Sequence, residues 1–498
     1  MTFVIGLLAI TLFGAVLRRY HIAVAGLWYD ELAEAVVATS NGASFFEGIR
    51  AQGGAAPLDY LGVRTVTFLL GHSPAATRTW SLLAGIATIP AAGMVARAIS
   101  RRATAGLAAA FLTATSPFLV AYSQEARFYA LTALAAVLVL WTFHLAMERS
   151  RKRDWFAFSL ATAVALYTYY FLAVIVVACG IAVLSEALAA RMRRAWEQER
   201  HVWWPRASGL VLSVAGATLS VTPWLLYALP IQLSKTYPYG GPGPFTLSSV
   251  RRIVETVLAP APADQIGALW RPLMAGSVCL AAILGFLLAR RFSPAVLALL
   301  LTPALLFPLV WLADARSSYF LMARHFIVIA PVLYILAGAG FVISIERVTR
   351  HRRRARVVLY VGAVLVWSAL SVPPLDAHYA TAASSKPAWH RAGDDVAAHI
   401  CPGATAYVNL GPGLLFGIGY HHPELIEHGS ELRTGPSVDA PAAIRELGLK
   451  PADWVVLWLN YYVTKQNSLP LITSELGARG YHYRDFPQIR VFSPPDQC

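Results

Sequence analysis

The sequence Leu27-Trp28-Tyr29-Asp30-Glu31 follows the first long apolar run of the chain, residues 3–17, and places two adjacent carboxylates just beyond it. An apolar run of about 20 residues is long enough to cross a bilayer as a helix. Acidic side chains are costly near hydrocarbon, and where they occur they usually mark a function. We therefore expect a membrane protein whose chemistry takes place at the outer end of its first helix.

The composition indicates a protein that crosses the membrane many times. Of its 498 residues, 57% are hydrophobic and only 14% are charged, whereas soluble domains carry about 25% charged residues. Residues 3–17 lack a basic start and a small-residue cleavage site, so we expect an uncleaved first helix. About eleven apolar runs are long enough to span a bilayer, and they lie at residues 3–17, 80–98, 104–121, 128–147, 155–171, 172–189, 208–228, 272–289, 294–313, 325–345 and 356–374.

The basic residues indicate the orientation of these helices. The formal net charge is +14, but the charge is spread over short loops, so nucleic acid is not an expected partner. Because basic loops remain in the cytoplasm, we predict a cytoplasmic N-terminus and an extracytoplasmic C-terminus, with loops 18–79 and 229–271 outside. Five alternate loops hold 20 of the 41 basic residues, at 97–102, 149–153, 191–206, 290–291 and 347–356.

The tail of the chain has the pattern of a small separate domain. It is polar, and about 120 residues suffice for an α/β fold. We therefore predict an all-α transmembrane module at residues 1–375 and an extracytoplasmic α/β domain at 376–498. The pattern predicts strands at 404–410 and 453–460, helices at 394–400, 440–447 and 469–479, and a closing hairpin at 481–492.

The four cysteines and the histidines predict neither a metal site nor a cofactor. Cys179 and Cys279 lie in apolar runs, whereas Cys401 and Cys498 lie in the tail and could pair in an oxidising compartment. No spacing of cysteine or histidine matches a metal motif. A divalent cation held by carboxylates of the first loop is possible but is not predicted.

The first candidate for chemistry is the pair Asp30-Glu31, with Glu34 one helical turn later. A carboxylate at this place could accept the proton of a hydroxyl group. The alternative is a solvated helix N-terminus, where acidic groups offset the helix dipole. Two adjacent acids do not decide between these interpretations by themselves.

The second candidate is the polar corner between the third and fourth apolar runs. Tyr122, Gln124, Glu125 and Arg127 lie here between apolar flanks, on the same predicted face as Asp30. The planar fork of an arginine suits a lipid phosphate. The alternative is an arginine that extends to the membrane interface, but that interpretation does not account for Gln124 and Glu125.

The order of these motifs resembles one family, the bacterial GT-C glycosyltransferases related to protein O-mannosyltransferases and to the aminoarabinose–lipid A transferase. The resemblance covers roughly residues 1–345 and is strongest in the first 135. One difference lies in the first loop, where the family's usual paired prolines read Ala56-Pro57. The motifs that carry the resemblance are Asp30-Glu31, Ala56-Pro57-Leu58-Asp59-Tyr60, Arg78, Ser123-Gln124-Glu125-Ala126-Arg127-Phe128-Tyr129 and Arg324-His325-Phe326.

The resemblance implies a donor sugar carried on a polyprenyl phosphate, transfer without a nucleotide, and inversion at the anomeric carbon. Asp30 would be the catalytic base, and Glu31, the second member of the catalytic pair, would orient Asp30 or the sugar hydroxyls. Arg127 would meet the donor phosphate, whose developing charge such cations stabilise. The other residues that the resemblance assigns to substrate binding are Arg78 and Arg324 as lesser phosphate ligands, Gln124 and Glu125 as orienting groups, and Tyr122, His325 and Asp59.

The sequence therefore predicts a multi-pass glycosyltransferase of the bacterial inner membrane, surrounded by membrane lipids. On family grounds the favoured acceptor is an envelope glycolipid or glycan, and a protein hydroxyl is the alternative within the same class. A lipid-linked sugar transporter or flippase is the alternative from another class. Transporters tend to show inverted repeats and polar residues at mid-membrane, and neither is clear in this chain.

Overall fold

The computed structural model divides the chain into two compact units, which we describe separately. Unit one comprises Met1–Tyr20, Phe46–Gly62 and Thr79–His378, and unit two comprises His21–Phe45, Val63–Arg78 and Tyr379–Cys498. The structure describes residues 1–52, 55–192, 196–234, 246–260, 269–288, 293–317, 320–350, 352–382, 384–409, 417–432, 440–459 and 468–495.

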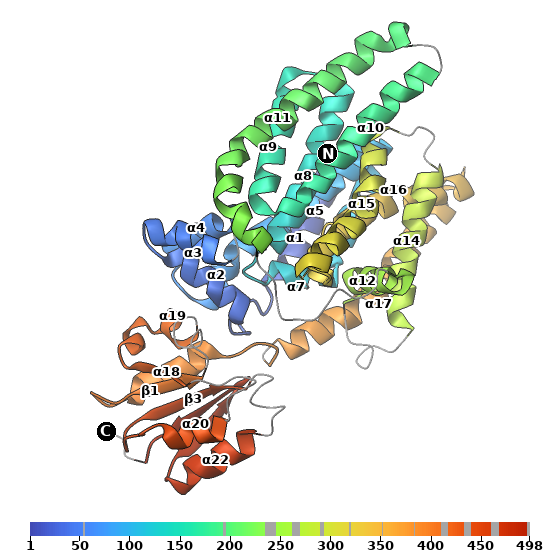
Figure 1. The fold of residues 1–498 in the computed structure, drawn as a ribbon. Coiled ribbons are helices and arrows are strands. Elements are labelled where there is room, and N and C mark those ends of the chain that lie inside the picture. Colours follow the sequence, from blue (N-terminus) through green and yellow to red (C-terminus); the bar gives the residue numbers. More distant parts are fainter. Residues whose placement is uncertain are drawn as a thin grey trace. The chain divides into compact units, whose positions relative to one another are not determined.

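Unit one is built from helices (Figure 1). Their apolar sequences leave many large hydrophobic side chains exposed on the outside, as helices that face lipid require. The helices that lie wholly or mainly in this unit are α1 (Thr2–Arg19), α5 (Pro74–Ser100), α6 (Ala103–Thr115), α7 (Pro117–Ser123), α8 (Tyr129–Arg149), α9 (Lys152–Thr168), η1 (Tyr170–Leu172), α10 (Ala173–Met192), α11 (Trp196–Ser234), α12 (Leu247–Leu258), α14 (Trp270–Leu288), α15 (Pro294–Ser317), η2 (Ala323–Phe326), α16 (Ile329–Thr349) and α17 (Arg353–Thr381).

Each of the apolar runs predicted from the sequence falls on a helix or on a bent pair of helices. Among the described residues, eight helices are long and apolar enough to cross a membrane, and α6 with α7 makes a further bent pair, at 59°. Helix α9 has 17 residues, and α14 holds only a shorter apolar stretch, Trp270–Leu284. The predicted class, a helical membrane protein with a small C-terminal sheet, is confirmed, whereas the predicted number of about eleven spans is not.

The bend between α6 and α7 arises at Pro117, which has no N–H to donate to the carbonyl of Thr113. Arg18, at the end of α1, supplies the missing donors. Its Nη2 donates to the Thr113 carbonyl and its Nη1 to the Ala114 carbonyl, each at 2.9 Å. Because Arg18 is fully buried, these bonds offset the cost of placing a cation in the membrane. The bend sets where α7 leads into the polar corner at Tyr122–Arg127.

Unit two contains a five-stranded sheet of order β2-β1-β3-β5-β4. Strand β1 pairs in parallel with β2 and β3, and β5 pairs antiparallel with β3 and β4. The predicted strands, helices and closing hairpin of the tail are confirmed, and β2 is an addition. The elements are β1 (Ala406–Asn409), β2 (Gly429–Leu432), β3 (Trp454–Trp458), β4 (His482–Phe486), β5 (Ile489–Ser493), α18 (Trp389–His399), α19 (Gly419–His421), η4 (Pro423–Ile426), α20 (Ala440–Glu446) and α22 (Ser468–Ala478).

The sheet has an apolar core on each face, and Figure 1 shows α18 on one face and α20 with α22 on the other. Alternate residues of a strand point to opposite faces. In β3, Trp454 and Val456 accordingly belong to one core, and Val455 and Leu457 to the other. The predicted α/β domain is therefore a three-layer arrangement.

Helix α2 (Tyr29–Thr39) also belongs to this second unit, although the sequence assigned the whole first loop to the module at 1–375. Leu27, Leu32 and Ala35 share an apolar core with Trp389 and Val396 of α18. The segment that carries Asp30 is thus packed into the same core as the tail. Helices α3 (Ala43–Ala51) and α4 (Leu58–Leu70) each have residues in both units.

Cys401 is disulfide-bonded, whereas Cys179 and Cys279 are free thiols. The sequence suggested that Cys401 could pair with Cys498, but Cys498 lies outside the described residues, so this pairing stays a prediction.

Candidate functional site

The residues that the sequence singled out divide between the two units. Asp30, Glu31 and Arg78 lie in unit two. The remaining seven lie in unit one: Asp59, Tyr122, Gln124, Glu125, Arg127, Arg324 and His325.

Glu31 is the centre of a buried ion network in unit two. Its side chain is 0% exposed. One carboxylate oxygen, Oε1, accepts from Nε of Arg78 at 2.8 Å, and Oε2 accepts from Nη2 of Arg78 at 3.0 Å. Oε2 also accepts from the backbone N–H of Trp28 at 3.2 Å, as a residue in the first turn of a helix does in a capping box. Glu31 therefore fixes the start of α2.

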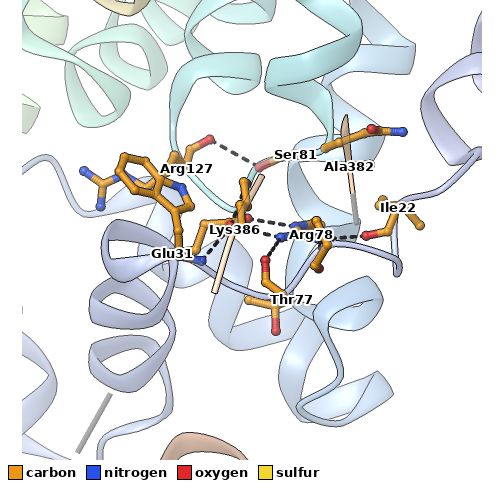
Figure 2. A network of polar contacts seen from close by, with 12 residues as sticks. Ile22, Glu31, Thr77, Arg78, Ser81, Arg127, Ala382 and Lys386 are labelled. Carbon is orange, nitrogen blue, oxygen red and sulfur yellow. Dashed lines mark hydrogen bonds and ion pairs between the residues drawn. The ribbon is translucent and has the colours of Figure 1, made fainter. Parts of the chain in front are cut away.

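All five N–H groups of Arg78 donate hydrogen bonds to acceptors within unit two. Besides the two bonds to Glu31, Nη1 donates to the carbonyls of Ile22 at 2.7 Å and Ala25 at 2.8 Å, and Nη2 donates to the carbonyl of Gly26 at 2.6 Å. Its side chain is 1% exposed. Arg78 thus holds the loop before α2 against the start of α5 (Figure 2).

Lys386, from the tail, is the second cation of this network and was not predicted. Its ammonium group donates to Oε2 of Glu31 at 2.8 Å, and its side chain is 19% exposed (Figure 2). Burial acts to raise the pKa of Glu31, but the charges and hydrogen bonds of Arg78 and Lys386 outweigh burial and lower it to about 2. Glu31 consequently stays ionised at all physiological pH values, with little capacity to accept a proton.

The backbone near Lys386 approaches the loop before α2 closely. A Cβ atom at Gly26 would lie 2.0 Å from the carbonyl oxygen of Pro387. Only a glycine permits this approach, because any side chain would collide with backbone. The close approach brings Lys386 within reach of Glu31.

Asp30 precedes Glu31 in the first turn of α2 but has a different environment. It is half-buried, whereas Glu31 is fully buried. Successive residues of an α-helix are rotated by about 100° around its axis, so the two carboxylates cannot point in the same direction. Of these two adjacent acids, Glu31 therefore faces the interior of unit two, and Asp30 points in a different direction.

Gln124 joins three separate segments of unit one. Its amide nitrogen donates to the carbonyls of Arg18 at 2.9 Å and Tyr20 at 2.6 Å. Its amide oxygen lies 3.0 Å from Nε2 of His378. The amide thus holds the end of α1, the end of α7 and the late part of α17 together. Because Gln124 is buried, these bonds account for its polar side chain at this place.

Arg127 and Arg324 both act on His325. The side chains of both arginines are half-buried. Burial of the His325 ring, followed by the charges of Arg324 and Arg127, holds the pKa of His325 well below its usual value. The charge of Arg324 also acts on Tyr122, together with that of Glu125. The structure therefore brings five of the predicted residues into one electrostatic cluster, which we call the arginine cluster: Arg127, Arg324, His325, Tyr122 and Glu125.

Aromatic rings surround the arginine cluster. Nδ1 of His325 lies 2.7 Å from the hydroxyl of Tyr169, and the two rings stack at 6.0 Å. Tyr129 lies edge-on to both Tyr122 and His325. The guanidinium of Arg127 lies 5.4 Å from the Phe128 ring, and its backbone carbonyl accepts from the Ser81 hydroxyl at 3.2 Å (Figure 2). The cluster thus sets a neutral histidine, two arginines and the Glu125 carboxyl group among aromatic rings.

Asp59 lies in the first turn of α4 and is buried. The preceding residue, Leu58, packs against Ala84, Ala130 and Leu131. One turn later the backbone of Gly62 lies against the Trp80 ring, so closely that a Cβ would come within 2.1 Å of it. Asp59 therefore stands at the start of a helix that is tightly packed in unit one.

Sequence reasoning missed three partners of these residues: Lys386, Tyr169 and His378. Each lies far along the chain from the residue it contacts, at separations of 355, 156 and 254 residues. Lys386 offered a weak signal, as one of five lysines in an arginine-rich chain. Among the described residues, no group of three or more His, Cys, Asp or Glu side chains could hold a metal ion.

Comparison with known proteins finds similarity to one protein family and to solved structures. The family model described as dolichyl-phosphate-mannose-protein mannosyltransferase matches residues 56–220. A search of curated proteins found no match to the chain.

Two solved structures of ArnT from Cupriavidus metallidurans share the fold. The apo structure aligns with a TM-score of 0.59 and 14% identity, over 98% of this chain and 97% of that chain. The structure bound to undecaprenyl phosphate aligns with a TM-score of 0.58, also at 14% identity and over the same shares.

AglB, the oligosaccharyltransferase of Archaeoglobus fulgidus, solved with an inhibitory peptide and a dolichol-phosphate, aligns with a TM-score of 0.50 and 13% identity. The alignment covers 99% of this chain and 74% of that chain. These findings confirm the resemblance inferred from the sequence. The predicted enzyme class, a glycosyltransferase, agrees with the matched family.

Proposed function

We propose that this multi-pass membrane protein is an inverting glycosyltransferase that moves a sugar from a polyprenyl-phosphate donor to a glycolipid or glycan of the bacterial envelope. One observation carries the choice of enzyme class. The mannosyltransferase family model matches residues 56–220, the segment that contains Asp59, Arg78 and the polar corner at Tyr122–Arg127. The fold shared with ArnT over nearly the full length of both chains supports the same choice.

The proposed donor is a sugar on a polyprenyl phosphate. ArnT binds undecaprenyl phosphate and AglB binds a dolichol-phosphate in the solved structures. Both ligands are long isoprenoid chains that end in a phosphate. A cluster of two arginines among aromatic rings suits such a head group.

Asp30 is the proposed general base. Its carboxylate would take the proton of the acceptor hydroxyl as the hydroxyl oxygen bonds to the anomeric carbon. The bond from that carbon to the phosphate oxygen breaks, and the polyprenyl phosphate leaves with the electron pair. Attack from the side opposite the leaving group inverts the anomeric centre.

Of the two roles that the resemblance implied for Glu31, orienting Asp30 or orienting the sugar hydroxyls, this proposal keeps the first. With a pKa of about 2 and hydrogen bonds from Arg78, Lys386 and Trp28, it is a poor proton acceptor. We assign it, with Arg78, to positioning: the two side chains hold the first turn of α2 and so hold Asp30. Arg78 has no N–H left for a donor phosphate, so we do not assign it to phosphate binding.

Arg127 and Arg324 are the proposed ligands of the donor phosphate. Phosphate gains negative charge as the sugar leaves, and fixed cations stabilise that charge. His325 stays neutral at physiological pH because burial and the two arginines lower its pKa. It can therefore hydrogen-bond to the donor without adding a third positive charge.

The proposed location is the bacterial inner membrane, with the N-terminus in the cytoplasm and unit two outside. The five basic loops support this orientation through the positive-inside rule. Asp30 and the tail would then act at the outer face, where envelope acceptors are presented.

A protein hydroxyl is the second candidate acceptor. The matched family is described by its transfer of mannose to protein, and the AglB structure holds an inhibitory peptide. The reaction at the anomeric carbon would be the same, so the roles of Asp30 and Arg127 would not change.

The test compares a deletion strain that carries the wild-type gene with strains that carry Asp30→Asn or Asp376→Asn at matched expression. Asp376 is an exposed aspartate of α17 and serves as the control for the same chemical change. Mass spectrometry would follow polyprenyl-phosphate sugars, envelope glycans and glycopeptides. We expect Asp30→Asn to slow transfer by about 10²–10⁴-fold, so that one lipid-linked sugar accumulates while one glycan loses that sugar.

Loss of the sugar from a glycopeptide instead would favour the protein acceptor. If the Asp30→Asn strain has the same lipid-linked sugars and glycans as wild type, Asp30 is not the base, and the interpretation as a transporter is favoured. A defect shared by Asp376→Asn would mean that the change reports on folding rather than on catalysis.

A further inference from the structure

At the end of unit one that carries the basic loops, helix ends enclose a cavity of about 1230 Å³. Four helices end there (α5, α8, α10 and α16), and two begin there, α15 and α17. Its volume exceeds the range of about 300–1000 Å³ that is usual for small-molecule sites.

Among the described residues, the lining of this cavity carries five arginines against three glutamates. The arginines are Arg101, Arg102, Arg347, Arg350 and Arg356. Each of the three glutamates already has an arginine partner: Glu346 pairs with Arg102 at 2.6 Å, Glu148 with Arg101 at 3.7 Å, and Glu186 with Arg206 from outside the lining. Counted over the described lining alone, the arginines exceed the glutamates by two, and Arg206 adds a further positive charge beside Glu186.

Several of these arginines are fixed by neighbouring backbone and side-chain oxygens. Nε of Arg356 donates to the Thr349 hydroxyl at 3.2 Å, and its Nη2 donates to the carbonyl of Arg350. Nη1 of Arg102 donates to the Ser100 carbonyl at 3.3 Å. Guanidinium groups that are already held in place lose little freedom when an anion binds.

The start of α15 adds to the positive character of the cavity. Ser293 and Pro294 both line it, and Ser293 caps the helix by accepting from the Val296 N–H at 3.3 Å. The N-terminus of this 24-residue helix carries a partial positive charge. The helix dipole and the arginines therefore both favour a negatively charged ligand.

Apolar residues complete the lining and indicate an amphiphile. Ala98, Ile99, Val296 and Ile343 lie in the same cavity as the arginines. A free phosphate would leave these side chains without a partner, whereas a lipid can place its phosphate at the arginines and its first chain carbons against them. Basic pockets between membrane helices at the cytoplasmic side are known to bind anionic lipid head groups.

We propose that this cavity is a binding site for the phosphate head group of an anionic phospholipid, separate from the arginine cluster and independent of the glycosyltransferase activity. Orientation by the positive-inside rule would explain basic residues in these loops. It would not explain why they line one cavity together with apolar side chains.

The test uses native mass spectrometry of the purified full-length chain with phosphatidylglycerol or phosphatidylcholine of identical acyl chains. Wild type should bind one phosphatidylglycerol more tightly than phosphatidylcholine. Arg347→Gln with Arg350→Gln should weaken this binding by roughly an order of magnitude, and Glu346→Gln should strengthen it by removing a negative charge. Arg153→Gln, an exposed basic-loop residue outside the lining, is the matched control and should not change it.

Equal binding of the two lipids, or wild-type phosphatidylglycerol binding by the double variant, would overturn the proposal. Inorganic phosphate added as a competitor separates the two sources of the anion. If millimolar phosphate displaces the lipid from wild type and binds the double variant more weakly, the site is one for a small anion and the lipid assignment is wrong. Opposite effects of the Arg347/Arg350 and Glu346 variants cannot come from misfolding, which would weaken binding in both.

Discussion

Arg78 in unit two and Arg127 in unit one are both arginines that the resemblance connected with the donor phosphate, and the structure gives them different surroundings. Arg78 is buried, and all five of its N–H groups donate to Glu31 and to three backbone carbonyls. Arg127 is half-exposed beside the aromatic rings of its cluster and acts with Arg324 on His325. Arg78 holds backbone within unit two, whereas Arg127 lies partly exposed beside aromatic rings and a second arginine.

The same contrast separates Asp30 from Glu31. The two acids are adjacent in sequence, yet Glu31 is enclosed by cations and Asp30, at the preceding helical position, is half-buried. A charged group whose hydrogen-bonding capacity is already used by the protein contributes to stability, because breaking a buried pair leaves a charge without compensation. Residue type and motif therefore indicate a site, but the hydrogen bonds that Glu31 and Arg78 already make within unit two exclude these two side chains from acting on a ligand.

The largest effect is expected from Arg78→Ala. It would leave Glu31 buried without its main cation and remove the donors for the carbonyls of Ile22, Ala25 and Gly26. We expect a loss of about 3–5 kcal/mol in the free energy of unfolding, seen as poor yield and a lower unfolding temperature in detergent. Glu31→Gln in the same chain should recover part of the loss, because the uncompensated charge is gone.

An unfolding temperature equal to that of wild type in Arg78→Ala would show that the network does not stabilise unit two. The contrast with Arg127 would then have to be abandoned.

Arg127→Ala should affect the rate of sugar transfer and leave the stability of the fold nearly unchanged, the opposite of what we expect for Arg78→Ala. We expect the unfolding temperature to change little, since the loss is about 1 kcal/mol or less for a half-exposed side chain. Transfer should slow by about 10²–10³-fold, because a cation at the leaving phosphate is lost. The measurement uses purified protein and the lipid-linked sugar that accumulates in the Asp30→Asn strain.

Arg324→Ala in the same assay sharpens this prediction, since both arginines act on His325. Full transfer by the Arg127→Ala protein would remove Arg127 from the proposed phosphate site.

The smallest effect is expected from Lys386→Ala. Glu31 has a pKa of about 2 in the folded protein, below its ordinary value of 4.5, so it stabilises the fold above about pH 4.5. This stabilisation is lost as the pH falls toward 2. Removing Lys386 raises the pKa of Glu31 toward its ordinary value, so acid unfolding should begin at a higher pH, with a loss of about 2 kcal/mol at neutral pH.

The measurement is the unfolding temperature as a function of pH, with Lys450→Ala as a control lysine of the same unit. Parallel pH curves for wild type and Lys386→Ala would contradict the role of Lys386 in the network.

Much of the architecture could be predicted from the sequence, because the signals are local. A membrane helix needs about 20 apolar residues in a row, and each predicted run coincides with a helix or a bent pair. The strands and helices of the tail follow from hydrophobic periodicity, which is also local. Helices α9 and α14 are exceptions with a local cause, because they are shorter or less apolar. The bend of the predicted span at 104–121 has a local cause in Pro117 and a distant one in Arg18, which lies 95 residues from Thr113.

The resemblance placed Asp30, Arg127, Arg324 and His325 among the candidates, and the structure brings the last three into one cluster. The resemblance could not indicate that Glu31 and Arg78 would use their hydrogen-bonding groups on one another and on nearby backbone. That outcome depends on Lys386, 355 residues from Glu31, and on the backbone at Gly26 that only a glycine allows against Pro387.

The sequence by itself thus determined the helical membrane class, the small α/β domain and the residues that can carry charge near the membrane. Only the tertiary structure decided which charges are buried together, that α2 packs into the core of the tail, and which predicted residues form the arginine cluster. Hydropathy and helix periodicity are properties of neighbouring residues, whereas desolvation and ion pairing depend on atoms that approach one another only after the chain has folded.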